Sequence, residues 1–141
     1  MKYIDSNEEV AIQPQTLDEW RTQRRGRSGA VVVPNDVDIE ALADELPLLD
    51  LIALQFPKWT DGRAYSQARL LRTRYRFGGE IRATGDVVAD MLPLLARTGF
   101  DAVALRTDQS VETARRALGF FAHHYQGDVM RSQPRFAREV A

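Results

Sequence analysis

The sequence alternates four times between a short apolar run and an amphipathic stretch, and this alternation constrains the fold more than any other feature. The runs lie at 30–33, 51–56, 80–84 and 101–105, and the third carries the charged residues Glu80 and Arg82. Each run is followed by a stretch whose apolar residues recur with helical spacing. Four successive βα units of this kind predict an α/β fold, with a parallel sheet and right-handed crossovers.

Two arrangements of four parallel strands fit this pattern. One is an open, doubly wound sheet of the flavodoxin type, and the other is half of a (βα)8 barrel with consecutive strand order. The connections are short and uniform, which favours the consecutive order. Four parallel strands leave two bare edges, so a half-barrel is expected either to form a homodimer or to cover its edges with the N-terminal segment.

At 141 residues the chain is expected to form one domain with flanking segments. We divide it into an N-terminal extension (1–29), an α/β domain (30–126) and a C-terminal tail (127–141). Within the extension we expect a short strand at 9–12 and a helix that Thr16 caps.

Several residues are expected to limit the helices of the α/β domain. Pro93 lies inside the third helical pattern and should kink or shorten it, and Gly99 should end it. Gly78 or Gly79 should end the second helix with a left-handed residue, and Ser110 should cap the fourth. The first helix is predicted from one apolar stripe, Ile39, Leu42, Ala43 and Leu46.

Composition excludes several classes of function. The net charge of −1 gives no electrostatic reason to expect nucleic acid or a membrane surface as a partner. The chain has no cysteine, which excludes a thiol nucleophile and a cysteine-ligated cluster. His123 and His124 are adjacent and make a poor metal pair, so we expect neither a metal nor a cofactor. The first residues lack an apolar signal segment, and we expect a cytoplasmic protein.

Both arrangements place ligands at the carboxyl ends of the strands, which selects the four loops 34–38, 57–63, 84–86 and 106–110. The loop after the second strand is the first candidate site. Asp61, Gly62 and Arg63 stand where the following helix begins, and free N–H groups and the helix dipole attract an anion there. Arg63 could hold the oxygens of a small oxyanion, with Ser66 one turn further on and Lys58 across the loop. Alternatively, Asp61 simply caps the helix.

The third strand is the second candidate site. Alternation places Glu80, Arg82 and Thr84 on one face of the strand, and Ile81 and Ala83 on the other. Buried charges must pair with one another or bind something. Glu80 and Arg82 therefore form either a structural ion pair or the lining of a ligand pocket.

Asp86 follows this strand and begins the next helical pattern, as a cap or as a second anion-facing terminus. Asp61 and Asp86 could also act as an acid–base pair across neighbouring loops. The sequence contains no nucleophile elbow, Walker loop or dinucleotide-binding glycine motif, so no catalytic signature supports this idea. Phe56, Trp59 and Tyr65 surround the same loop and either line a pocket or cover the sheet end.

The central part of the chain, from Asp50 to Leu105, resembles a bacterial family of unknown function (domain of unknown function nine-three-four). The resemblance rests on these segments: Phe56–Lys58, Asp61–Arg63, Tyr65–Ser66, Ala68–Arg72, Gly79–Glu80, Arg82–Ala83, Gly85–Asp86 and Gly99–Asp101. Members of that family are commonly encoded beside assimilatory sulfite reductase. The resemblance implies a role in sulfur assimilation, with the reductase as a possible partner, and it implies no reaction.

Three functions remain open. The first is an accessory protein of sulfite reduction that binds a small oxyanion or an anionic cofactor through Arg63, Arg82 and neighbouring helix N-termini. The second is a (βα)-type enzyme with Asp61 or Asp86 as acid or base. The third is a module that docks on the reductase and has no small-molecule site. An open pocket around Glu80 and Arg82 would favour the first two, whereas mutual pairing and a closed sheet end would favour the third.

Overall fold

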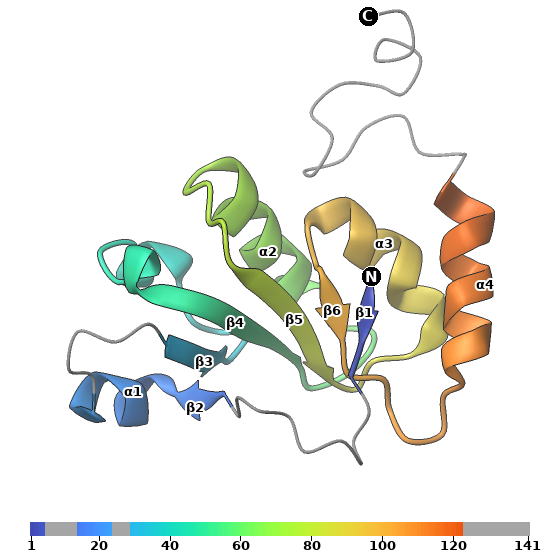
Figure 1. Ribbon diagram of the computed structural model, residues 1–141, viewed down its shortest axis with the longest axis horizontal. Helices are drawn as coiled ribbons and strands as arrows, with labels where there is room; N and C mark the ends of the chain where they lie inside the picture. Colours follow the sequence, from blue (N-terminus) through green and yellow to red (C-terminus); the bar gives the residue numbers. More distant parts are fainter. Residues whose placement is uncertain (5–13, 24–28, 123–141) are drawn as a thin grey trace, which may run out of the picture.

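The computed structural model describes residues 1–4, 14–23 and 29–122 as an α/β fold around one parallel sheet of six strands (Figure 1). The strands are β1 (Lys2–Tyr3), β2 (Gln15–Thr16), β3 (Gly29–Val33), β4 (Leu49–Phe56), β5 (Glu80–Gly85) and β6 (Ala102–Val103). Their spatial order is β1-β6-β5-β4-β3-β2, and the sheet is open. The α/β class and the consecutive order of the four predicted strands are confirmed, and the flavodoxin-like order is wrong.

The N-terminal extension covers both edges of this sheet. β1 pairs in parallel with β6, and β2 pairs in parallel with β3. The four predicted strands therefore do not form the edges themselves. This arrangement is one of the two outcomes expected for a half-barrel, and it removes the bare edges that motivated the predicted homodimer. The predicted strand at 9–12 lies outside the described residues.

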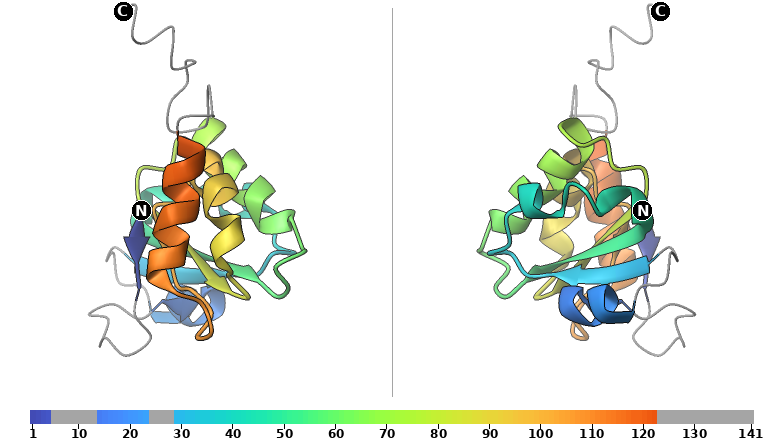
Figure 2. Two further views of the ribbon diagram at one scale, coloured as in Figure 1. Left: turned by 90° about the vertical axis from the view of Figure 1, so that its right-hand side faces the viewer. Right: turned by 90° about the vertical axis from the view of Figure 1, so that its left-hand side faces the viewer.

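The helices lie on one face of the sheet (Figure 2). They are α1 (Leu17–Gln23), α2 (Arg63–Thr73), α3 (Leu92–Thr98) and α4 (Val111–Ala122), with 3₁₀ turns η1 (Ile39–Leu42), η2 (Leu46–Leu48) and η3 (Ala89–Met91). The main core forms beneath them, because apolar strand residues such as Ile52, Leu54 and Ile81 meet the helices there. Among the described residues, every helix is too short or too polar to cross a lipid bilayer.

The opposite face carries a smaller apolar cluster. Ala30, Leu51 and Ala53 pack together on it, with Val32 at its margin. In Figure 1 this face is turned toward the reader, and none of the labelled helices crosses it. We call it the helix-free face.

The segment between β3 and β4 departs from the sequence prediction. The stripe from Ile39 to Leu46 predicted one helix, but the segment forms the two short turns η1 and η2. Pro47 explains the difference, because proline lacks an N–H and disfavours helical backbone at the residue before it.

The ends of the other helices follow the predictions in part. Pro93 stands in the first turn of α3 and shortens the third helix, and Gly99 ends that helix at φ 106°. Ser110 caps α4, because its hydroxyl accepts from the N–H of Thr113 at 3.3 Å. The second helix was expected to end on a left-handed Gly78 or Gly79, yet the residue with positive φ is Arg76, at 51°.

Gly85 shapes the carboxyl end of β5. Its φ is 96°, and a Cβ atom added there would lie 2.5 Å from the carbonyl oxygen of Phe56. Glycine permits this close approach, and the next N–H, that of Asp86, donates to the same oxygen at 2.8 Å. The turn therefore fixes the start of the loop that carries Asp86.

Candidate functional site

Asp61 fills the place at the start of α2 where an external anion was expected. Its carboxylate accepts from the N–H of Arg63 at 3.1 Å and from Arg63 Nη2 at 2.9 Å. It also accepts from Asn35 Nδ2 at 2.9 Å, which links the loop to the segment after β3. The hydrogen bonds from Arg63 hold the pKa of Asp61 at about 2. The chain thus supplies its own anion to this helix end.

The carboxylate of Asp86, in the loop after β5, is likewise bound by donors from the chain itself. Its carboxylate accepts from the N–H of Trp59 at 2.8 Å and from Arg106 Nη1 at 2.8 Å. Arg106 also donates to Asp108 through Nε at 2.6 Å. The hydrogen bond from Arg106, followed by that from Trp59, lowers the pKa of Asp86. Asp86 therefore joins the loops after β4, β5 and β6.

The surroundings of Asp61 and Asp86 differ from those typical of an acid–base pair. Arg63 holds one in its ionised form and Arg106 holds the other, and each lowered pKa moves away from the neutral range that general catalysis needs. The two carboxylates also have separate partners. Among the described residues, no group of three or more histidine, aspartate or glutamate side chains could hold a metal ion. His123 and His124 lie outside those residues.

The other residues of the first candidate site face solvent. Lys58 and Ser66 are exposed, and within the described part of the chain Lys58 has no ion pair. Trp59 is also exposed, with 55% of its surface accessible. Phe56 and Tyr65 turn inward instead, with ring centroids 5.0 Å apart. The aromatic residues thus divide between the core and the surface.

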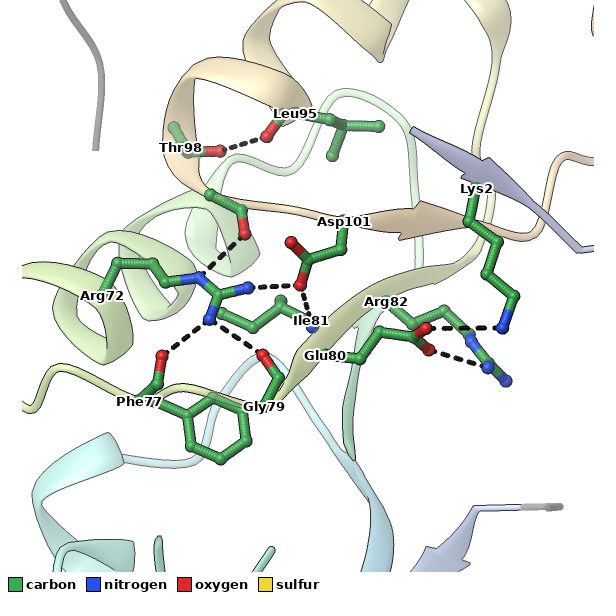
Figure 3. A network of polar contacts seen from close by, with 11 residues as sticks. Lys2, Arg72, Phe77, Gly79, Glu80, Ile81, Arg82, Leu95, Thr98 and Asp101 are labelled. Carbon is green, nitrogen blue, oxygen red and sulfur yellow. Dashed lines mark hydrogen bonds and ion pairs between the residues drawn. The ribbon is translucent and has the colours of Figure 1, made fainter. Parts of the chain in front are cut away.

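Glu80 and Arg82 lie on the helix-free face, and alternation along β5 is as predicted, because Ile81 and Ala83 join the helix-side core. Arg82 Nη2 donates to Glu80 Oε2 at 2.8 Å, and Lys2 Nζ lies 3.6 Å from Glu80 Oε1 (Figure 3). The Arg82 side chain is 5% exposed. Its Nε is buried and has no hydrogen-bond partner among the described residues.

The predicted site residues therefore form two groups rather than one. Arg63 begins α2 on the helix side of the sheet, whereas Arg82 projects from the middle of β5 on the other side. Arg106 was missed as a site residue. The signal that could have found it is its position directly after the fourth predicted strand, since carboxyl ends of parallel strands meet at one rim.

Several residues that carry the family resemblance meet at the opposite end of the sheet (Figure 3). Arg72 is 9% exposed, and its guanidinium donates to three carbonyl oxygens and to the carboxylate of Asp101. The carbonyls belong to Phe77 at 2.7 Å, Gly79 at 2.8 Å and Gly99 at 3.0 Å. The same Asp101 oxygen accepts from the N–H of Ile81 at 2.9 Å. This cluster ties α2, β5, α3 and β6 together and is structural.

The fold and the site define an open, consecutively ordered parallel α/β protein whose carboxyl rim carries arginine–carboxylate pairs, of which Arg106–Asp86 joins two loops. The sequence profile of a bacterial family, "Bacterial protein of unknown function (DUF934)", matches residues 30–136. The chain belongs to this family, and the predicted resemblance is confirmed. A search of curated proteins gives no match.

Proposed function

We propose that this protein is a non-catalytic accessory module that docks on a protein partner through the carboxyl rim of its sheet. The carrying observation is that the two rim carboxylates proposed for catalysis, Asp61 and Asp86, are already paired. Asp61 is paired with Arg63, and Asp86 is paired with Arg106. Groups paired in this way stiffen loops and are not free for proton transfer. A stiff rim suits recognition, because less freedom is lost on binding.

Trp59 is the expected anchor of this docking surface. It is the most exposed of the large apolar side chains of the described residues, at 55%. Its backbone N–H donates to Asp86 at 2.8 Å, which holds the main chain of the loop that carries the indole. Tryptophan and arginine dominate the binding energy of many protein interfaces. Lys58 and Arg63 flank Trp59 in the same exposed loop and add charge to its margin.

The partner that we propose is assimilatory sulfite reductase, which places the protein in sulfur assimilation and in the cytoplasm. The support is the resemblance to a family that is commonly encoded beside that enzyme. The absence of a catalytic signature in the sequence agrees with an accessory role. Because Asp61 and Asp86 are each paired with an arginine, docking is favoured over the alternative of an enzyme that uses one of these carboxylates as acid or base.

The test is the affinity of the purified protein for the reductase, measured by biolayer interferometry. Trp59→Ala should weaken binding by about 2 kcal/mol, which is typical of an interface hot spot. Leu94→Ala is the matched control, because Leu94 is an exposed apolar residue on α3. Equal affinities of the Trp59 and Leu94 variants, or no binding by the wild type, would remove the proposal.

A second candidate function is binding of a small oxyanion at Arg82, and one specific observation favours it. Within the described part of the chain the buried Nε of Arg82 has no partner, and a buried donor without a partner costs free energy that an anion would recover. Glu80 already accepts a hydrogen bond from Nη2 of Arg82. A bound anion would therefore accept from Nε and leave the ion pair with Glu80 in place. Arg63 takes no part, since it lies on the other side of the sheet.

Calorimetric titration with sulfite, sulfate and phosphate tests this candidate. Arg82→Lys keeps the charge but loses the planar donor fork, and it should weaken binding by about 1.5–3 kcal/mol. Arg63→Lys should leave the affinity unchanged. Absence of saturable heat with all three anions would exclude the site, as would equal binding by both variants.

A further inference from the structure

Charge is strongly segregated along the helix side of the sheet. The thirty residues from 28 to 57 contain six acidic side chains and no lysine or arginine. Residues 62–79 contain five arginines and no acidic side chain. The acidic stretch includes η1 and η2, and the basic stretch is α2 with the turn that follows it. The two stretches lie side by side, because the amide of Gln67 on α2 donates to the carbonyls of Pro34 and Val37.

A groove separates the two stretches at the amino end of the sheet, opposite the carboxyl rim. We call it the amino-end groove, and its volume is about 400 Å³. Leu46, Pro47 and Asp50 lie on its acidic side, and Tyr75 and Arg76 lie on its basic side. Its floor is partly apolar and its two walls carry opposite charges.

The charges beside this groove lack ion-pair partners among the described residues, and Arg74 lies over the ring of Tyr75 at 5.5 Å. Asp44 and Asp50 are exposed on one side, and Arg74 and Arg76 are exposed on the other. Across the part of the chain that the structure describes, none of these four side chains forms an ion pair. By contrast, Arg63 and Arg72 of the same basic stretch are paired with Asp61 and Asp101. Four exposed charges without ion pairs in the described part of the chain, two acidic and two basic, therefore face each other across this groove.

We infer that the amino-end groove is a self-association surface whose occupant is a second copy of this chain. In this dimer a twofold axis passes between the acidic and the basic wall of the groove. Asp44 and Asp50 of each copy then face Arg74 and Arg76 of the other copy, so the same contacts form two times. The apolar side chains of the groove, such as Pro47 and Tyr75, then meet their symmetry mates. This dimer leaves the carboxyl rim free, so it goes beyond the proposed docking function and does not depend on it.

Sedimentation equilibrium at low salt tests the inference with two double variants. Arg74→Glu with Arg76→Glu sets acid against acid, and Asp44→Arg with Asp50→Arg sets base against base. Each variant alone should dimerise at least about tenfold more weakly than the wild type, because like charges in contact are costly. An equimolar mixture of the two should recover the dimer, since both contacts are then complementary.

The control is Arg115→Glu with Arg116→Glu, which makes the same change in charge on α4 and should leave dimerisation unchanged. Salt should weaken the wild-type dimer, because exposed charges are screened over about 10 Å at 0.1 M. The inference is overturned if the wild type is a monomer at high micromolar concentration, or if the mixture does not dimerise better than its components. If both double variants dimerise as strongly as the wild type, the interface lies elsewhere on the molecule.

Discussion

At the scale of single residues, the carboxylates of the rim serve the fold by neutralising arginines. Asp61 occupies the start of α2 that the sequence offers to an anion, and Arg63 turns back onto it at 2.9 Å. The same residue types would mark a ligand site if their partners were absent. The identity of the partner, rather than that of the residue, decides between the two interpretations.

This pairing predicts a pH dependence of stability. The folded-state pKa of Asp61, about 2, lies below the ordinary value of 3.8. The stabilisation from its carboxylate is therefore present above pH 4 and is lost as pH falls toward 2. The difference in unfolding free energy between wild type and Asp61→Asn should shrink across that window in urea titrations. Asp90→Asn, which removes an exposed charge without an ion pair, is the control. A difference that stays constant down to pH 2 would contradict the pairing.

At the scale of secondary-structure elements, one arginine joins four of them. Arg72 on α2 bonds to residues that precede β5, end α3 and begin β6. These contacts give structural roles to several residues that carry the family resemblance, including Gly79, Gly99 and Asp101. No catalytic role is needed to account for them. Elements that meet at one buried cation can hardly move independently.

Loss of this arginine should therefore destabilise the whole domain. Arg72→Ala should lower the free energy of unfolding by about 3 kcal/mol, because it leaves a partly buried carboxylate without its counter-ion. Arg72→Lys should restore only part of that loss, since an ammonium group lacks the planar fork that reaches three carbonyls. Arg69→Ala, on the exposed side of the same helix, should change stability by less than about 0.5 kcal/mol. Thermal and urea unfolding give the values, and equal effects at 69 and 72 would show that the cluster is not structural.

At the scale of the whole molecule, the sequence predicts the centre of the sheet better than its margins. The runs that become β3 and β4 are largely apolar, as strands buried on both faces must be, and β5 is recognisable by its alternation. The strands β1 and β2 have two residues each, and such short segments carry no periodic pattern. β1 and β2 form because they pair with the edge strands of the sheet, and those edges exist only once the sheet has folded.

The candidate site was predictable to a similar degree. The rule that parallel strands present their carboxyl ends at one rim located the loops of Asp61 and Asp86. The alternation of β5 correctly placed Glu80 and Arg82 on one face. The partners could not be predicted, because Arg106 reaches Asp86 from 20 residues away and Asn35 reaches Asp61 from 26. The sequence also could not predict that Arg63 and Arg82 lie on opposite sides of the sheet, because this depends on which face α2 packs against.

The most direct test of docking through the carboxyl rim is hydrogen–deuterium exchange with and without the purified reductase. The account predicts that added reductase slows exchange in the loop from Pro57 to Gly62, and in the loop around Arg106. Exchange at the start of β4 and in the turn from Arg74 to Gly79, at the other end of the sheet, should not change. Protection confined to that other end, or no protection anywhere while the two proteins bind, would contradict the account.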